Sequence, residues 1–417
     1  MTLAARYVLP GESPPIQRGL VTITRGRIQE VGKQGQRRAD IDLGNVAIVP
    51  GFVNAHTHLE LGPIPSDESQ GAEDEIAWLR RVIQQRRASP EGGLETRARA
   101  SLAQALQAGT TLVGDITTAG ASWPAIAAAP VRAVVYSELI GLQRMRGLQS
   151  ENEAWEWLKT IKPEGQVAAC ARPGLSPHAP YSTAGWLYHR AAGTRMPLAT
   201  HLAEMPEELE LLAHGTGRLR EFLEDLGAWD NEWGPIGQRP ADYVRKGDLK
   251  RADWLIAHGN YLDRDDFWQL RAEAAADGHR VAVAYCPRTH ARFGHAPHPF
   301  RAMLDRGIVV CLGTDSLASA PSLSVLDEAR YLRRVVPELP GPLLLAMATI
   351  FGAWALRAET VTGSLSPGKS ADLAIVALPD QDAADPHDLL FEAETPVLAT
   401  MFEGKFHHLS KALKGLD

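Results

Sequence analysis

Cysteine is scarce in this chain of 417 residues. The sequence contains only Cys170, Cys286 and Cys311, and these are too far apart to form a CxxC pair. This usage argues against a disulfide framework and against a zinc site built from thiolates, and it is typical of a reducing compartment. We therefore expect a cytoplasmic protein.

Long apolar runs and an excess of basic charge are also missing. No run of about 18 apolar residues occurs, so we predict no membrane span. The opening MTLAARYVLPGE lacks the basic start and apolar core of a signal peptide. The formal net charge is −7 and the pI is about 6.1, values that do not suggest a nucleic-acid or anionic-membrane partner. The length allows one large barrel and a smaller domain.

The two ends of the chain have similar patterns. LVTITRGRIQEVG near the start alternates apolar and polar residues, and SADLAIVAL and PVLATMFEG near the end have comparable strand character. Chain termini often lie close together in space. We expect residues 1–50 and 365–417 to form one composite β-sandwich domain.

The middle of the chain, residues 51–364, alternates short apolar strands with helical segments. This pattern predicts an α/β protein with a (β/α)₈ TIM-like barrel. In such barrels the active site lies at the carboxyl ends of the strands. The predicted strands are residues 51–57, 110–116, 131–139, 167–176, 196–202, 254–260, 281–287 and 308–315.

The first predicted strand ends in His56-Thr57-His58. Residues i and i+2 of a strand point to the same side, and zinc binds neutral imidazole nitrogens. Two imidazoles on one side therefore suit a metal, although a single HxH is also explained by polar residues at a strand end.

The other strand ends strengthen the metal interpretation. His178 follows the fourth predicted strand, His201 and His258 end the fifth and sixth, and Asp315 ends the eighth. A lone histidine is more often a satisfied polar residue than a ligand. Five of the fourteen histidines at strand ends, together with one aspartate, favour a shared site.

Three motifs carry a family resemblance. PGFVNAHTHLE, GTDS and GSLSPGKSADLAIV resemble the signatures of the amidohydrolase superfamily, and the match covers nearly the whole chain. The resemblance implies a TIM-like barrel with a β-sandwich formed by both chain ends.

The absence of one lysine narrows the resemblance to a subgroup of this superfamily. Binuclear members usually bridge two metals through a carboxylated lysine at the fourth strand, but this chain has none between Lys162 and Lys246. The chain is therefore more similar to the single-metal deaminases, which carry HxxE after the fifth strand, here His201 to Glu204. This subgroup resembles the aminodeoxyfutalosine and S-adenosylhomocysteine deaminases. Within it HTHLEL, SPHAPYS, HLAE and CPRTH lean toward the deaminases that act on aminodeoxyfutalosine.

The resemblance implies a role for each of these residues. One divalent metal ion would be held, with zinc favoured and iron possible. The implied ligands are His56, His58, His201 and Asp315. Asp315 would also accept a proton from water, Glu204 would protonate a ring nitrogen, and His258 would stabilise the tetrahedral intermediate. The alternative for Glu204 is a carboxylate favoured by a helix N-terminus.

Substrate contacts are less sharply defined. His178, Glu60 and Arg144 are the candidates, for a sugar or carboxylate, a hydroxyl or base edge, and a carboxylate respectively. Arg144, like nearby Arg146, is equally compatible with a surface position. The roles of Trp78 and His290 stay open between substrate contact and packing.

We expect a metal-dependent hydrolytic deaminase that acts on a small molecule, a purine-nucleoside-like or related N-heterocyclic amine, and releases ammonia. An aminodeoxyfutalosine-type substrate is favoured. A triazine-type chlorohydrolase or aminohydrolase, or another amidohydrolase acting on cyclic carbon–nitrogen bonds, is the alternative. A binuclear amide hydrolase and an inactive scaffold remain as further readings, and a homo-oligomer is possible.

Overall fold

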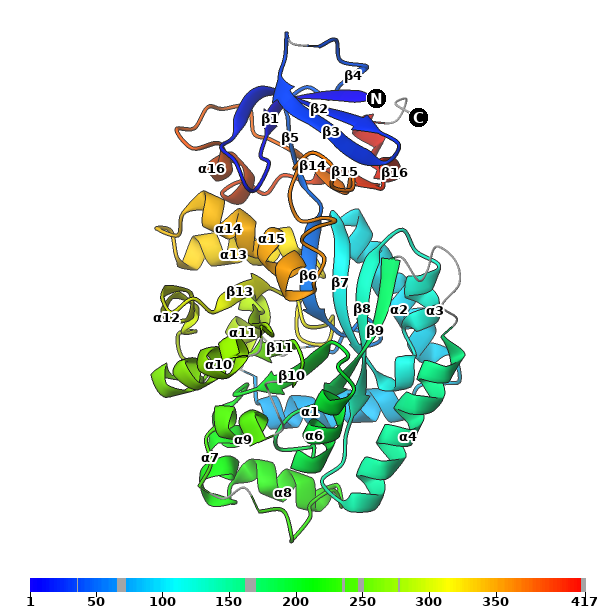
Figure 1. Cartoon of the computed structure of the whole chain (residues 1–417), viewed down its shortest axis with the longest axis vertical. Helices are drawn as coiled ribbons and strands as arrows, with labels where there is room; N and C mark the ends of the chain where they lie inside the picture. Colours follow the sequence, from blue (N-terminus) through cyan, green and yellow to red (C-terminus); the bar gives the residue numbers. More distant parts are fainter. Residues whose placement is uncertain are drawn as a thin grey trace.

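Two eight-stranded sheets organise the protein (Figure 1). The computed structural model describes residues 1–35, 37–65, 73–161, 170–234, 237–246, 251–276 and 278–413. One sheet forms a barrel, and the other is built from both ends of the chain.

The barrel consists of eight parallel strands in chain order. They are β6 Phe52–Thr57, β7 Thr110–Thr117, β8 Arg132–Leu139, β9 Ala171–Pro177, β10 Leu198–Leu202, β11 Trp254–His258, β12 Val281–Tyr285 and β13 Val309–Leu312. The last strand meets the first through a parallel bridge between Thr57 and Asp315. There the His58 backbone N–H donates to the Asp315 carbonyl at 2.9 Å. The predicted (β/α)₈ barrel is confirmed, and residues 167–169 of the fourth predicted strand lie outside the described residues.

The barrel strands are apolar on both faces because the interior and the surrounding helices both cover them. Small and large side chains, such as those of Ala55 and Tyr136, belong to one buried cluster. Gly114 shows how close the packing is, since a Cβ there would lie 2.2 Å from the Ala55 carbonyl oxygen.

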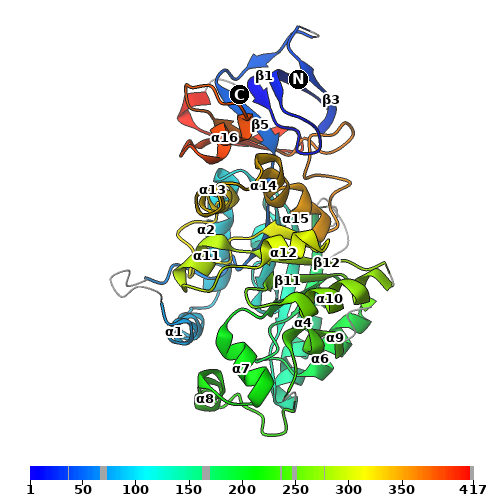
Figure 2. The same ribbon diagram turned by 90° about the vertical axis from the view of Figure 1, so that its left-hand side faces the viewer.

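The helices surround the barrel, except for α16 Pro386–Phe391, which lies in the part of the molecule formed by the chain ends (Figures 1 and 2). They are α1 Glu75–Arg87, α2 Gly93–Gln107, α3 Trp123–Ala127, α4 Arg144–Thr160, α6 Gly185–Gly193, α7 Pro206–His214, α8 Arg218–Asp225, α9 Pro240–Lys246, α10 Arg264–Ala276, α11 Pro287–Arg292, α12 Phe300–Asp305, α13 Val325–Val335, α14 Gly341–Ala348, α15 Ile350–Ala355 and α16 Pro386–Phe391, with short 3₁₀ turns η2 Thr118–Gly120 and η4 Lys411–Leu413. In the part of the chain that the structure describes, none of these helices has the length and apolar character needed to cross a membrane.

The start of α1 is fixed by a side-chain cap. Asp74 accepts hydrogen bonds from the backbone N–H groups of Ile76 at 3.0 Å and Ala77 at 3.1 Å. Such a cap satisfies donors that have no partner within the helix. It fixes where Glu75 and, three turns later, Arg86 lie.

The second sheet joins the two chain ends. Its strands are β1 Thr2–Val8, β2 Ile16–Thr24, β3 Arg27–Lys33, β4 Ile41–Asp42, β5 Val46–Pro50, β14 Leu373–Ala377, β15 Val397–Phe402 and β16 Lys405–Leu409. Strand β5 pairs antiparallel with β14, placing Ile48 opposite Ile375. The predicted second domain built from both ends is thereby confirmed, whereas its exact limits at residues 1–50 and 365–417, and 51–364 for the barrel, stay a prediction.

The small domain lies at the amino ends of the barrel strands, because β6 follows β5 directly. Helices α7 and α8 lie at the far end of the molecule in both views (Figures 1 and 2). The carboxyl ends of the strands therefore face away from the small domain.

Candidate metal centre and active site

The structure brings the four predicted metal ligands together at the carboxyl ends of three strands. His56 lies in β6 and His58 just after it, His201 lies in β10, and Asp315 follows β13. All four are buried. One ligand atom each from His56, His58 and His201 lies within 4.8 Å of the other two, and the same holds for His56, Asp315 and His258, the last residue of β11.

Unsatisfied imidazole nitrogens mark this cluster. Neither ring nitrogen of His56 has a hydrogen-bond partner among the described residues. His201 Nδ1 lies 3.1 Å from the His178 carbonyl oxygen, to which it can donate, and its Nε2 then faces His58 Nε2 at 3.1 Å. Buried polar groups without partners are costly. Imidazole nitrogens that converge with a carboxylate fit a divalent metal ion, which would complete their coordination.

Asp315 completes this set with a charged oxygen. Its Oδ1 lies 3.5 Å from His56 Nε2 and 3.8 Å from His58 Nε2, and its Oδ2 accepts a hydrogen bond from Ser319. Burial alone would raise the pKa of Asp315, but the His56 imidazole 3.5 Å away and the charges of His58 and His258 lower it below the ordinary value. Asp315 is therefore ionised at neutral pH.

Glu204 and His258 form a pair beside the predicted metal ligands. His258 Nε2 is 3.1 Å from Glu204 Oε1. Burial, followed by the charges of Asp315 and Glu208, raises the pKa of Glu204 well above its ordinary value. A carboxyl group that keeps its proton can act as an acid toward a bound molecule.

The backbone around Glu204 is held by neighbouring side chains. Glu208 accepts from the N–H groups of Ala203 at 3.0 Å and Glu204 at 3.1 Å, and Asn260 Nδ2 donates to the Glu204 carbonyl at 2.9 Å. Ala203 has φ of 52°, and His258 and Asp315 have φ of 65° and 57°. Left-handed backbone is uncommon for residues other than glycine and clusters at functional sites.

The three predicted substrate contacts differ in how they are placed relative to the cluster of histidines and Asp315. His178 adjoins the cluster, with its ring centroid 4.8 Å from that of His201. Its Nδ1 lies 2.6 Å from Ser182 Oγ. Glu60 is also buried, but its carboxylate accepts hydrogen bonds from Thr117, Thr118 and Arg86.

Arg144 lies apart from the histidines. Its guanidinium stacks over Trp186 at 4.8 Å, in a cavity of about 400 Å³ also lined by Trp233 and Tyr243. Across the described chain, Arg144 makes no hydrogen bond or ion pair with the cluster. Neighbouring Arg146 is exposed.

Two residues that the sequence left open have partners within the protein. Trp78 is buried, and its Nε1 donates to the Ala318 carbonyl at 2.9 Å while its ring packs against Phe293. His290 Nε2 lies 2.9 Å from the Ala296 carbonyl oxygen. These contacts indicate packing roles for both.

Glu138 is a buried carboxylate that the pattern of strand ends did not predict. Glu138, near the end of β8, lies between Arg86 and His178: its Oε2 is 2.9 Å from Arg86 Nη2 and its Oε1 is 3.9 Å from His178 Nε2. Arg86 also contacts Glu60 at 3.1 Å. The detectable signal was a lone acidic residue closing an apolar strand, in VVYSELIG.

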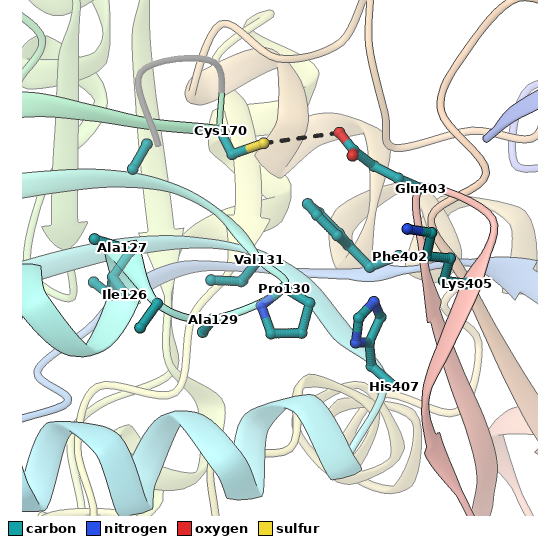
Figure 3. A pocket seen from close by; sticks show the side chains of 12 residues that line it. Ile126, Ala127, Ala129, Pro130, Val131, Cys170, Phe402, Glu403, Lys405 and His407 are labelled. Carbon is teal, nitrogen blue, oxygen red and sulfur yellow. Dashed lines mark hydrogen bonds between the residues drawn. The ribbon is translucent and has the colours of Figure 1, made fainter. Parts of the chain in front are cut away.

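A further cavity of about 390 Å³ lies between the starts of barrel strands and the turn from β15 to β16 (Figure 3). Cys170 Sγ donates to Glu403 Oε1 at 3.8 Å there. Burial raises the pKa of the Cys170 thiol. The residues that line this cavity include none of the predicted site residues.

The comparison with protein families agrees with this geometry. Residues 47–406 match the model of the amidohydrolase family. The chain belongs to the amidohydrolase family. The predicted resemblance is thereby confirmed, as is the prediction of a hydrolase that acts on carbon–nitrogen bonds.

Three individual relatives of this amidohydrolase share between 21% and 28% sequence identity with it. The 5-methylthioadenosine/S-adenosylhomocysteine deaminase of Moorella thermoacetica is 28% identical over 412 residues, which cover 92% of this chain and 86% of the relative. The aminofutalosine deaminase of Helicobacter pylori, solved with methylthio-coformycin, has a TM-score of 0.80 and 22% identity, covering 97% of this chain and 99% of that one. The atrazine chlorohydrolase of Arthrobacter aurescens, solved with zinc, has a TM-score of 0.78 and 21% identity over 98% and 95% of the chains. At these identities the structural likeness concerns the fold.

Proposed function

We propose that this amidohydrolase is a metal-dependent deaminase that replaces the exocyclic amine of an adenine-type nucleoside with oxygen and releases ammonia. The observation that carries the proposal is Glu204, a buried carboxyl group with a raised pKa, 3.1 Å from His258 and beside the cluster of histidines and Asp315. The deaminase name of the Moorella relative supports the same reaction class, and the aminofutalosine deaminase fold is consistent with it.

The metal is proposed to be a single zinc ion. Its ligands are His56, His58, His201 and Asp315, a nitrogen and oxygen set that suits zinc, and the zinc reported for the Arthrobacter chlorohydrolase is consistent with this choice. The end of β9 offers His178 and no lysine that a second metal would need. When bound, such a metal acts as a Lewis acid and makes hydroxide available near neutral pH.

The protein's own residues move the protons. Asp315 accepts one proton from the attacking water, while Glu204 donates its proton to the ring nitrogen next to the carbon that is attacked. His258 donates a hydrogen bond to the oxygen that is added. Asp315 then passes its proton to the leaving amine, and Glu204 recovers a proton from the added hydroxyl as the carbonyl forms. The products are ammonia and the oxo heterocycle.

His178, Glu60 and Arg144 stay proposed substrate contacts, and their positions support them unequally. His178 adjoins the cluster, Glu60 acts through Arg86, and Arg144 reaches the substrate only if that molecule extends to Trp186. The cytoplasmic location and a possible homo-oligomer stay predictions from the sequence.

Ammonia release from a substrate panel tests the proposal. Zinc-loaded protein is incubated with aminodeoxyfutalosine, S-adenosylhomocysteine, methylthioadenosine, guanine, cytosine and a chlorotriazine. We expect ammonia from at least one of the three adenine nucleosides, with aminodeoxyfutalosine favoured. Chloride release from the triazine without deamination would favour the chlorohydrolase instead, and no reaction across the panel would overturn the proposal.

A further inference from the structure

Glu138 is a buried carboxylate with one oxygen unused. Its side chain is only 3% exposed. Arg86 Nη2 donates to Oε2 at 2.9 Å, whereas Oε1 has no hydrogen-bond partner among the described residues. His178 Nε2 is 3.9 Å from Oε1, which is beyond hydrogen-bond distance.

The surrounding charges keep Glu138 ionised. Burial raises the pKa of Glu138, but the charges of Arg86, His178 and His58 outweigh burial and lower the pKa to about 2. An ionised carboxylate can only accept hydrogen bonds. The unused oxygen is therefore an acceptor that requires a donor.

No donor of the protein fills this position within the described residues. Arg86 is shared between Glu138 and Glu60, and the carboxylate of Glu60 is already saturated by Thr117 and Thr118. If Glu138 served only as the ion-pair partner of Arg86, burial of Oε1 would cost free energy that no hydrogen bond offsets. Oε1 lies beside His178, and the His178 ring adjoins that of His201. Oε1 therefore faces the cluster of histidines and Asp315.

We propose that Glu138 and His178 form a subsite that binds a hydroxyl group of the substrate, such as a ribose hydroxyl of the nucleoside. The inference rests on the proposed deaminase function. A hydroxyl oxygen about 2.7–2.8 Å from both atoms bridges their 3.9 Å separation, donating to Glu138 and pairing with His178 Nε2. The same carboxylate repels an anionic group, so this position selects a neutral hydroxyl group.

Substrate analogues without hydroxyls test this subsite. We compare kcat/KM for adenosine and 2′,3′-dideoxyadenosine in zinc-loaded wild type, Glu138→Gln and Glu153→Gln, an exposed carboxylate on α4. Hydrogen bonds to charged groups predict a wild-type preference of about ten- to a hundredfold for adenosine. Glu138→Gln should reduce that ratio toward one, and Glu153→Gln should preserve both the ratio and the activity.

A binding measurement on wild type keeps the test decisive if Glu138→Gln does not fold. Calorimetry of the two nucleosides should give a similar ratio of dissociation constants. Equal turnover and equal binding of the two nucleosides by wild type, or an unchanged ratio in folded Glu138→Gln, would overturn the subsite while deamination itself stands. If wild type deaminates neither of these two nucleosides nor any nucleoside of the substrate panel, the deaminase proposal fails and the assignment of the subsite to a nucleoside hydroxyl fails with it.

Discussion

At the scale of single residues, two carboxyl groups of one site are pushed in opposite directions. Burial and the charges of Asp315 and Glu208 raise the pKa of Glu204. Asp315 is equally buried, but histidines around it lower its pKa. Groups whose pKa values are separated in this way can divide acid and base roles at one pH. The environment, rather than the residue type, therefore suits Glu204 to the proposed role of proton donor.

Replacing Glu204 tests that role. We expect Glu204→Gln to keep its metal, because Glu204 is not a ligand, and to lower kcat about 10²- to 10⁴-fold by removing the transferable proton. Metal content by mass spectrometry and ammonia release measure the two effects. Glu210→Gln, an exposed neighbour on α7, is the matched control and should retain both. Full activity in metal-loaded Glu204→Gln would show that another group moves the proton.

At the scale of elements, the sequence predicts what local pattern determines. Each barrel strand is a short apolar run, and its last polar residue marks its carboxyl end, so His56, His201 and His258 could be placed without a structure. Arg86 and Glu138 could not, because they lie 52 residues apart and meet only after α1 has folded back over β8. Arg144 shows the converse, since its position after a strand did not reveal that its side chain stacks on Trp186.

The amino end of β11 carries an ion pair that should make stability depend on pH. Asp253 receives two hydrogen bonds from Arg357, at 2.6 and 2.7 Å, and one from the Arg280 backbone N–H at 2.9 Å. Burial opposes ionisation of Asp253, but these bonds outweigh burial and lower its pKa. The stabilisation is therefore full above the unfolded-state pKa of about 3.9 and is lost as pH falls through the lower folded-state pKa.

We expect Asp253→Asn to reduce the free energy of unfolding at pH 7 and to lose less of it on acidification than wild type. Urea denaturation at pH 7, 5, 4 and 3 measures both, and the difference between the proteins should narrow below about pH 4. A difference that stays constant over this range would contradict the account.

At the scale of the whole molecule, Arg132 joins the barrel to the domain built from the chain ends. From the first residue of β8, its Nε donates to Asp372 at 2.8 Å and its Nη2 to Ser370 at 2.9 Å and Glu403 at 3.1 Å. Its guanidinium also lies 5.0 Å from the Phe402 ring centroid. These contacts lie at the amino end of the barrel, opposite the cluster of histidines and Asp315.

Removing this link should destabilise the fold without changing the chemistry. Arg132→Met leaves Asp372 buried and unpaired, for which about 3–5 kcal/mol of the free energy of unfolding is expected to be lost. Urea denaturation measures the loss, and kcat/KM below the unfolding transition should match wild type. Arg99→Met, which breaks an exposed pair with Glu95, is the control and should cost about 0.3–0.5 kcal/mol. A fully stable Arg132→Met would show that other contacts hold the two parts together.

One metal ion and Glu204 are proposed to act together in the deamination of an adenine-type nucleoside. Zinc titrated into metal-free protein, with ammonia release from the best nucleoside of the panel followed at each addition, tests this claim most directly. We expect activity to rise from zero and to reach its plateau at one zinc ion per chain. A plateau at two ions, full activity without metal, or no ammonia at any zinc concentration would contradict it.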